Sequence, residues 1–457
     1  MISRLINTLA STQTNILFLT LSVLGILAFC VLANYSLLIP MVLLFMGFHL
    51  YFHQKASLKS FLNLGLLITL NIFMVNSIHS YHLMPGLAAP VASIAMLTML
   101  LFNDLELAFV ISFINSLLAG MIMKTGYEVM LIFFLGGLMG AYSLRGARTR
   151  GHLIVSGMYV SVINILALLL ITNNFSLFAD GQYLRHFLYP LLANGFICAF
   201  IVASLSKVFE FLFNVVTNYT LLELSDFNQP LLKRMILEAP GTYQHSLVVS
   251  TLAENAADII GANSLLARVG AYYHDIGKMV KPEYFTENQI MERNRHDDIE
   301  PSMSRLVIQS HVKEGVELAK RSHLNQKIID FITQHHGTSM MHYFYQRALE
   351  EAPEKEGVFE DDFRYPGPKP QTKESAIILL ADSAEAAVRS LDEHTPTRIE
   401  ETVKKVVNNK FIDGQLDECN LTLKEINKIS AAFVRNLNSI YHARVKYPDK
   451  KNGNSNK

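Results

Sequence analysis

Residues 271–278 read Ala-Tyr-Tyr-His-Asp-Ile-Gly-Lys and set a histidine directly before an aspartate, His274 and Asp275. A second adjacent pair, His335 and His336, follows downstream in Gln-His-His-Gly-Thr. Single residues of the same two types complete the pattern: His245, His311 and Asp382. A lone histidine is most often a core residue that a hydrogen bond satisfies. Two adjacent pairs with matching single residues favour a shared site instead.

The chemistry of this set of side chains indicates bound metal. Imidazole suits iron and zinc and carboxylate suits harder ions, so a mixed set suits manganese or iron. Seven ligands exceed what one tetrahedral zinc ion needs. They match two metals with a bridging carboxylate and leave positions open for water and phosphate oxygens. Two adjacent metals hold the attacking and leaving oxygens of an in-line displacement. We therefore expect two divalent ions, Mn²⁺ or Fe²⁺/Fe³⁺.

The half of the chain that carries these residues has the pattern of amphipathic helices joined by polar connections. No alternating strand pattern of any length is present, so the fold class is all-α. Residues 350–372 are charged and proline-rich and are interpreted as a surface insertion. Helices are expected to resume over 373–392, 397–409 and 422–445.

Three residues suit helix starts in this half. Thr242 is a candidate N-cap for a helix that runs to Ile260, and Asn263 is one for a helix that runs to His274. Pro301 suits the first turn of a helix that carries His311, because proline is tolerated there.

The other half is expected to lie in lipid. The chain has 78 charged side chains, 39 basic and 39 acidic, of which only 14 fall before residue 214. A membrane core requires about 20 apolar residues per helix, and backbone groups in lipid must be satisfied within helices. Six to eight spans are predicted, at about residues 15–34, 37–53, 59–79, 84–102, 105–123, 127–144, 153–173 and 186–213.

Basic connections predict the orientation of these spans. Positively charged residues favour the cytoplasmic side, and the basic connections contain Lys55, Lys59, Arg145, Arg148 and Arg150. An eight-span arrangement places them and the charged C-terminal half in the cytoplasm of a bacterial inner membrane. We therefore expect three regions: spans over 1–213, a soluble all-helical domain over 214–449, and a polar disordered tail over 450–457.

Composition narrows the classes of function. Three cysteines give no disulfide framework, which fits a reducing cytosol for the C-terminal half. That half is not strongly basic, so binding to a nucleic-acid polymer is not expected. Asp104, Glu106 and Glu128 fall at predicted span ends, where a solvated loop is the favoured interpretation over a transport pathway.

The motifs resemble the HD superfamily, and specifically the seven-transmembrane HD-domain proteins of bacteria. The resemblance runs from about residue 222 to 448 and includes Glu-Ala-Pro-Gly-Thr-Tyr-Gln-His-Ser at 238–246 and the stretch at 271–278. It also includes Phe-Arg-Tyr-Pro-Gly-Pro-Lys-Pro at 363–370, Leu-Ala-Asp-Ser-Ala-Glu-Ala-Ala at 380–387 and Gly-Gln-Leu-Asp-Glu-Cys-Asn-Leu-Thr at 414–422. A lone His-Asp pair would carry little weight, but this combination is specific.

The resemblance implies a reaction. Characterised members hydrolyse cyclic di-AMP to the linear dinucleotide pApA, and a hydroxide activated by two metals is the nucleophile. By this resemblance Asp275 is the bridging ligand, and the full ligand set is His245, His274, Asp275, His311, His335, His336 and Asp382.

Several further residues carry open alternatives. Lys278 either neutralises phosphate charge beside Asp275 or is an ordinary solvated lysine. Tyr243, Thr338 and Arg389 are candidates for phosphate or base contact, with packing or surface roles favoured for each. His296 and Asp297 form another pair, interpreted as a loop contact. Structural or solvated roles are expected for His323, His342, His394 and His442.

The chain departs from the family pattern in one place. Family members carry a large extracellular domain after the first span, whereas the connection at 34–38 is only a few residues long. The Gly-Tyr-Pro signature of relatives that cleave cyclic di-GMP is not found after His336, which argues against that substrate. A non-catalytic nucleotide receptor, a transport or scaffold protein, and a hydrolase of another nucleotide phosphoester remain alternatives, and a homodimer is left open.

Overall fold

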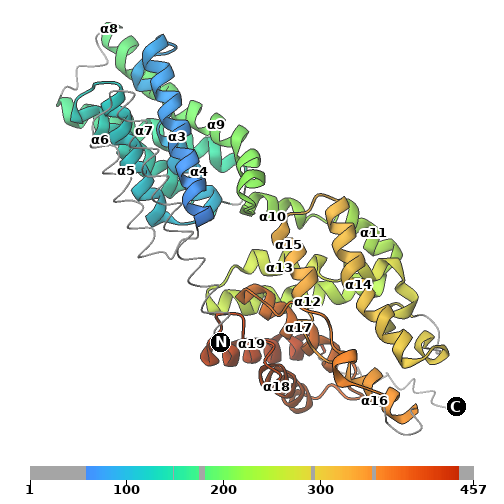
Figure 1. The fold of residues 1–457 in the computed structure, drawn as a ribbon. Helices are drawn as coiled ribbons and strands as arrows, with labels where there is room; N and C mark the ends of the chain where they lie inside the picture. Colours follow the sequence, from blue (N-terminus) through green and yellow to red (C-terminus); the bar gives the residue numbers. More distant parts are fainter. Residues whose placement is uncertain (1–57, 148, 174–180, 290–293, 352–356, 442–457) are drawn as a thin grey trace, which may run out of the picture. The chain divides into compact units, whose positions relative to one another are not determined.

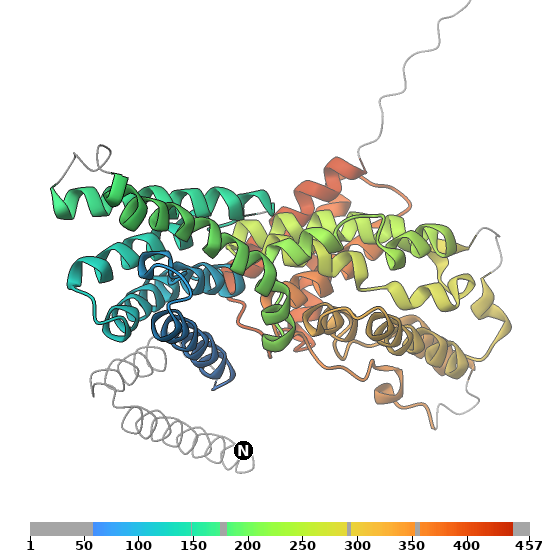
Figure 2. The same cartoon turned by 90° about the horizontal axis from the view of Figure 1, so that it is seen from above.

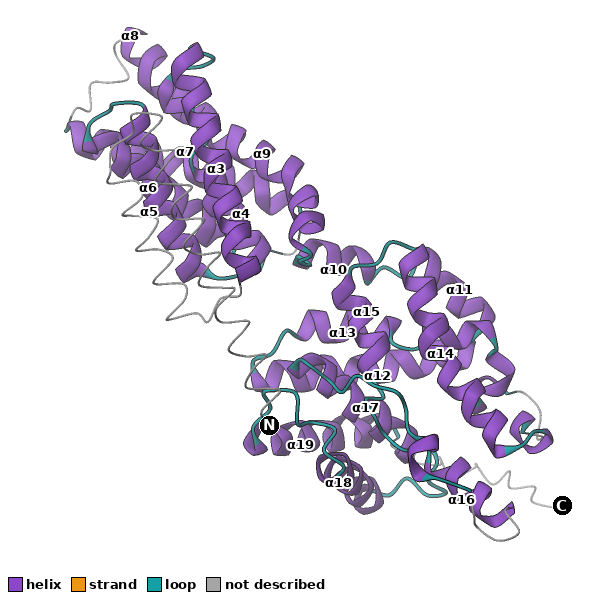
Figure 3. Ribbon diagram, in the orientation of Figure 1, coloured by secondary structure: helices purple, strands orange, loops and turns teal. Residues whose placement is uncertain are grey.

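The computed structural model describes residues 58–441 apart from 148, 174–180, 290–293 and 352–356 (Figure 1). The chain divides into two compact units, Met1–Tyr219 and Thr220–Lys457. In the described residues every regular element is a helix, and the only strand-like pairing is an isolated bridge between Met340 and Arg364 (Figure 3). The all-α prediction is confirmed.

The first unit is built from apolar helices. Its elements are α3 (Leu58–Tyr81), η1 (Gly86–Ala88), α4 (Ala92–Phe102), α5 (Leu105–Ile122), α6 (Tyr127–Ser143), α7 (Gly151–Thr172), α8 (Gly181–Tyr183), the π-helical η3 (Leu184–Leu188) and α9 (Tyr189–Phe213). Within the described residues, four helical stretches are long and apolar enough to cross a membrane: Asn63–Tyr81, Leu105–Ile122, Gly151–Thr172 and Gly181–Phe213. The stretches Gly86–Phe102 and Tyr127–Ser143 are apolar but shorter.

These helices match six of the expected runs, those from residue 59 onward. The runs expected at 15–34 and 37–53, and the short connection at 34–38, lie outside the described residues. Asp104 caps α5, because its side chain accepts a hydrogen bond from the backbone N–H of Leu107 at 2.9 Å. This agrees with its interpretation as a residue at a span end.

Helices α7 and α9 lie side by side and approach closely (Figures 1 and 2). A Cβ added at Gly195 would overlap the backbone carbonyl of Gly157, so only glycine fits at this contact. Asn164 donates to Asn194 at 3.1 Å, and Asn194 donates to the carbonyl of Ala89 at 2.6 Å. Small residues and side-chain amides are the usual means of holding helices together in lipid.

The second unit is a bundle of amphipathic helices with short 3₁₀ turns. Its elements are α10 (Asn218–Leu224), α11 (Pro230–Glu238), α12 (Pro240–Ile260), α13 (Ser264–Tyr273), η4 (Ile276–Val280), η5 (Pro282–Tyr284), η6 (Thr286–Asn288), η7 (Arg295–Asp298), α14 (Pro301–Arg321), α15 (Gln326–Gln334), α16 (His342–Glu351), η8 (Glu360–Phe363), α17 (Lys373–Arg389), α18 (Pro396–Ile412) and α19 (Leu423–Ile440). The tail predicted at 450–457 lies outside the described residues.

Two of the three predicted helix starts are confirmed. The side chain of Asn263 accepts from the backbone N–H of Leu266 at 3.0 Å, and Pro301 is the first residue of α14. The prediction for Thr242 is wrong. Helix α12 begins two residues earlier at Pro240, which is pre-organised for a first helical turn, and Thr242 is buried inside the helix.

The interpretation of 350–372 as a surface insertion is also wrong for its second half. Phe363 is buried and packs with Met341 and Phe344, and Pro370 is buried. The backbone N–H of Tyr365 donates to the carbonyl of Ser339 at 3.0 Å. Proline and charge indicated exposure, but aromatic side chains at intervals anchor this segment to the domain.

Candidate metal centre

The predicted ligands come from five separate parts of the second unit and converge. His245 lies in α12, His311 in α14 and Asp382 in α17, whereas His274 and Asp275 directly follow α13 and His335 and His336 directly follow α15. All are buried except His336, which is half-buried. Three helices and the turns that follow α13 and α15 therefore place seven polar side chains in one interior space.

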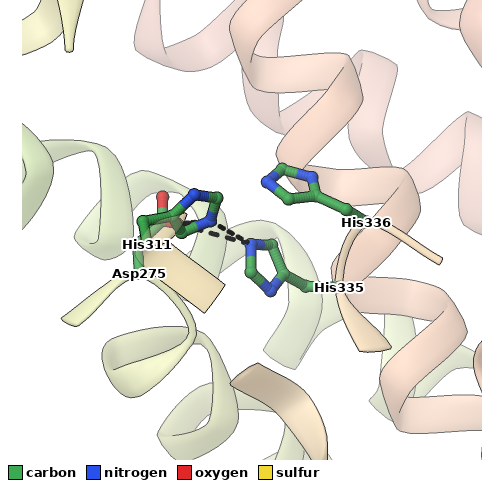
Figure 4. A group of neighbouring side chains, drawn as sticks. All are labelled: Asp275, His311, His335 and His336. Carbon is green, nitrogen blue, oxygen red and sulfur yellow. Dashed lines mark hydrogen bonds and ion pairs between the residues drawn. The ribbon is translucent and has the colours of Figure 1, made fainter. Parts of the chain in front are cut away.

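The seven side chains form two groups of metal-ligating atoms, with each group's atoms within 4.8 Å of one another. One group consists of Asp275, His311, His335 and His336 (Figure 4). The other consists of His245, His274, Asp275 and Asp382. Asp275 is the member that both groups share, so its carboxylate is placed to join two metal sites.

Three of the histidines are oriented by the backbone of their own helices. The Nδ1 atoms of His274, His311 and His335 each bond the carbonyl of the residue three positions earlier. A carbonyl only accepts, so each Nδ1 carries the hydrogen and each Nε2 of a neutral ring carries a lone pair. His311 Nε2 and His335 Nε2 then face each other 3.3 Å apart, 3.5 and 3.4 Å from Asp275 Oδ1.

His245 is oriented by a carboxylate instead. Its Nδ1 lies 2.5 Å from Glu385 Oε2, and its Nε2 lies 3.1 Å from Asp382 Oδ1. Glu385 is buried and also contacts Arg389 and the hydroxyl of Tyr441, each at 3.4 Å. A carboxylate behind a histidine is a common way to fix a metal ligand.

The electrostatics of the cluster are strongly perturbed. Burial lowers the pKa of His311 to about 4 and holds the pKa of His336 well below its usual range. Burial also lowers the pKa of His245, but hydrogen bonds to Asp382 and Glu385 reverse this and raise it to about 9. Although burial acts to raise the pKa values of Asp275 and Asp382, neighbouring cationic and hydrogen-bonding groups hold both below their usual range.

The residues present fit bound cations. His274 Nε2 and Asp275 Oδ1 are buried and make no hydrogen bond, a costly state for polar atoms without another partner. Lone pairs of several rings and two ionised carboxylates face one interior space, where they repel one another. Divalent ions between them would satisfy these atoms and reverse the repulsion. The donors are imidazole nitrogen and carboxylate oxygen, which suits manganese or iron.

Comparison with known proteins identifies the families that the two units match. The sequence matches the family described as 7TM receptor with intracellular HD hydrolase over residues 29–217, and the HD domain over residues 242–387. The chain belongs to this family. All seven clustered residues fall inside the matched HD domain, and that domain implies that the chain binds divalent metal.

Two curated relatives are similar to most of the chain. A Bacillus subtilis protein named cyclic-di-AMP phosphodiesterase PgpH is 36% identical over 90% of this chain and 60% of its own length. A Listeria monocytogenes protein of the same name is 44% identical over 71% of this chain and 45% of its own length. The chain therefore spans about half the length of the curated relatives it matches.

One solved structure is similar over the second unit. The crystal structure of the Listeria monocytogenes PgpH HD domain in complex with cyclic-di-AMP is 51% identical to this chain. The match covers 48% of this chain and all of that one, with a TM-score of 0.46.

Lys278 of the HD domain lies at the edge of the cluster. It stands in the 3₁₀ turn η4, where one turn is three residues, so its Nζ reaches 2.7 Å from Asp275 Oδ2. Its Nζ also lies 2.9 Å from Glu287, and its side chain is only 12% exposed. Burial acts to lower the pKa of Lys278, but the carboxylates of Asp275 and Glu287 raise it. Lys278 is therefore a buried cation and not a solvated one.

The three weaker candidates have partners of their own. Tyr243 packs edge-to-face against Phe227, and Thr338 exchanges hydrogen bonds with Gln415. Arg389 contacts Glu385, which in turn bonds the metal-ligand candidate His245. Packing or supporting roles fit all three, and a direct contact with substrate stays a prediction.

Among the described residues, the other histidines stand outside both ligand groups. His296 is buried against Phe344, and its Nε2 lies 2.8 Å from the carbonyl of Tyr284, so it makes the expected loop contact. His394 stacks on Tyr441. His442 lies outside the described residues.

Two residues beside the cluster were missed by reasoning from sequence. Glu385 follows Asp382 by three positions, so helical spacing was a usable signal for it. Tyr365 stacks on the ring of His336, with ring centres 4.1 Å apart. It lies in the segment interpreted as a surface insertion, and no spacing rule connects it to His336.

Proposed function

We propose that this chain is a membrane-anchored, metal-dependent phosphodiesterase that hydrolyses cyclic di-AMP to linear pApA. The observation that carries the proposal is the pair of ligand groups that share Asp275. Family membership and two relatives named as cyclic-di-AMP phosphodiesterases support the reaction and the substrate. A full set of ligands favours catalysis over a receptor that only binds nucleotide.

The seven residues of the cluster would hold two divalent ions, Mn²⁺ or Fe²⁺/Fe³⁺. When bound, such a pair supplies Lewis acidity toward phosphate oxygens and lowers the pKa of water. The protein supplies position: backbone carbonyls fix three imidazole rings and Glu385 fixes that of His245.

Lys278 is proposed to assist by charge. Its ammonium lies beside the shared carboxylate of Asp275 and stays protonated at neutral pH, because Asp275 and Glu287 stabilise the charge. A fixed cation there favours the approach of a phosphodiester and stabilises the negative charge that builds up as the phosphorus is attacked.

The location of the HD domain is part of the proposal. We place the spans, at 1–213, in a bacterial inner membrane and the HD domain, at 214–449, in the cytoplasm, with a polar tail at 450–457. Support comes from the basic connections around Lys55, Lys59, Arg145 and Arg150. Cyclic dinucleotide and bilayer are the proposed partners, and nucleic-acid polymer is not.

The test uses the full chain purified in detergent, stripped with a chelator and reloaded with Mn²⁺ or Fe²⁺. Cyclic di-AMP and cyclic di-GMP are supplied separately, and products are separated by chromatography. We expect metal-dependent formation of pApA from cyclic di-AMP, at a rate that Asp275→Ala lowers at least about 100-fold.

The matched control is Asp258→Ala, which removes an exposed carboxylate from α12 and should leave the rate unchanged. A folded, metal-loaded chain that cleaves neither dinucleotide would contradict the proposal. Cleavage that persists in Asp275→Ala would contradict the assigned centre.

A further inference from the structure

A cavity of about 580 Å³ is lined by both polar and apolar side chains. Helices α17 and α18 pack against each other and contribute to its wall. Among its lining residues are Ser339, Arg364, Ser383, Asn409, Lys410 and Asp413. Its volume is in the range of small-molecule sites.

Several residues that line the cavity are close neighbours of metal ligands in the sequence. Ser383 directly follows the ligand Asp382, and Ser339 comes three residues after the ligand His336. Arg364 directly precedes Tyr365, which stacks on His336. The cavity wall therefore includes residues one to three positions from metal ligands in the sequence.

Lys410 is the unusual residue of the cavity. Its Nζ donates to Ser339 Oγ at 2.6 Å, and among the described residues it forms no ion pair with a carboxylate within 4.0 Å. The neighbouring carboxylate of Asp413 is already engaged by Arg364 at 3.0 Å and by Gln415 at 2.8 Å. Burial lowers the pKa of Lys410, and the carboxylates of Asp382 and Asp413 act in the opposite direction without reversing the shift.

Removing a cation from water is costly, and an anionic ligand in direct contact with the cation would offset that cost. A cyclic dinucleotide carries two phosphodiester groups, each negatively charged. If one phosphodiester group lies at the metal ions, the other is also removed from water close by. It then requires a positively charged partner. Lys410 and the hydroxyl of Ser339 provide a donor pair in this cavity.

We propose that Lys410 and Ser339 form a subsite for the phosphate of the cyclic dinucleotide that is not being cleaved. This rests on the proposed function for the identity of the substrate. The subsite makes the enzyme select molecules with a second phosphate at a set distance from the reacting one. Arg364 takes part indirectly, because it binds the carboxylate of Asp413, which forms no direct ion pair with Lys410.

Lys410→Met tests the subsite in the metal-loaded full chain. Binding of radiolabelled cyclic di-AMP is measured by rapid filtration, and we expect the Kd to rise about 10- to 100-fold. Hydrolysis of bis(4-nitrophenyl) phosphate, which has one phosphodiester and no second phosphate, should change less than about twofold. Lys410→Arg should retain most of the binding.

Lys404→Met is the matched control, because Lys404 lies exposed on the same helix and pairs with Glu400; it should leave binding unchanged. The unfolding temperature of Lys410→Met should stay equal or rise, because a poorly compensated charge is removed. Unchanged cyclic di-AMP binding in Lys410→Met overturns the subsite, as does an equal loss toward both substrates.

The experiments distinguish failure of the proposed function from failure of the proposed subsite. If the wild-type chain binds cyclic di-AMP through Lys410 but does not cleave it, the subsite stands and the proposed function fails. If it cleaves cyclic di-AMP with no contribution from Lys410, the function stands and the subsite fails. A wild-type chain that does not bind cyclic di-AMP overturns both.

Discussion

The imidazole of His245 depends on a residue that is not a metal ligand. Glu385 lies 2.5 Å from its Nδ1 and is itself placed by Arg389 and Tyr441. Residues in this position typically affect metal affinity 10- to 100-fold. Glu385 is therefore a positioning residue whose effect should appear in metal binding before it appears in chemistry.

Glu385→Gln keeps the shape of the side chain and removes its charge. We expect metal affinity to fall about 10- to 100-fold, measured by competition with a chromophoric chelator and without any assay of hydrolysis. Glu401→Gln, an exposed position on α18, is the control. Equal affinities for the two variants would show that Glu385 has no role in metal binding.

Protonation of the buried histidines predicts a pH dependence for the metal-free chain. His311 has a pKa of about 4 in the fold and about 6.5 when unfolded, so the unfolded state binds more protons between these values. Stability should therefore fall as pH drops from 6.5 toward 4. His245 has the opposite effect, because its pKa is raised to about 9 in the fold. Its protonated imidazole contributes fully to stability below pH 6.5, and this contribution is lost as the pH rises through 9.

The metal-free HD domain should accordingly be most stable near pH 6.5. Amide hydrogen exchange of α12 and α13 in chelator-treated chain, compared at pH 4.5, 6.5 and 9 after correction for intrinsic rates, measures this directly. Protection that rises steadily from pH 4.5 to 9 would rule out the contribution of His245.

At the scale of elements, the ligands are brought together by a close contact between η4 and α14. A Cβ added at Gly277 would overlap the backbone carbonyl of His311 and crowd the backbone N–H of Gly315. Two ligands, Asp275 and His311, flank this contact. The absence of a side chain at residue 277 therefore sets how closely they approach.

Gly277→Ala should destabilise the HD domain by about 1–3 kcal/mol or more, since neither backbone can move aside without repacking. It should also lower metal affinity, because it moves η4 away from α14. Gly261→Ala is the comparison: residue 261 has a positive φ of 73° but open space around it. It should cost about 1–2 kcal/mol and keep metal affinity unchanged. Full metal affinity in Gly277→Ala would contradict this account.

Elements were predictable where local chemistry determines them. The cap at Asn263 and the proline start of α14 depend on residues within one turn, and both were confirmed. The start of α12 was not predicted, because a proline at residue 240 and a threonine at residue 242 both offer acceptable starts. The buried half of 350–372 was missed because Phe363 packs on residues distant in sequence.

At the scale of the whole molecule, the distribution of basic residues predicts orientation. A C-terminal fusion to green fluorescent protein should fluoresce, and the same fusion to alkaline phosphatase should be inactive, if the HD domain is cytoplasmic. Fusions truncated after Thr125 should behave oppositely, since the eight-span arrangement places Lys124 outside. The reverse pattern would overturn the orientation.

The sequence by itself determined that the first half lies in lipid and the second half in water. It also determined the helical class and the seven metal-ligand candidates. Apolar length, charge density and residue type are properties of the chain that need no partner. It also contained the motifs by which the family was recognised.

Only the tertiary structure decided which atoms meet. It showed that Asp275 is common to both ligand groups, that Glu385 supports His245, and that Tyr365 covers His336. It also placed Lys410 in the wall of a cavity, with no carboxylate of the described residues within 4.0 Å of its Nζ. These contacts join residues far apart in the chain, and packing, which no local pattern encodes, sets their distances.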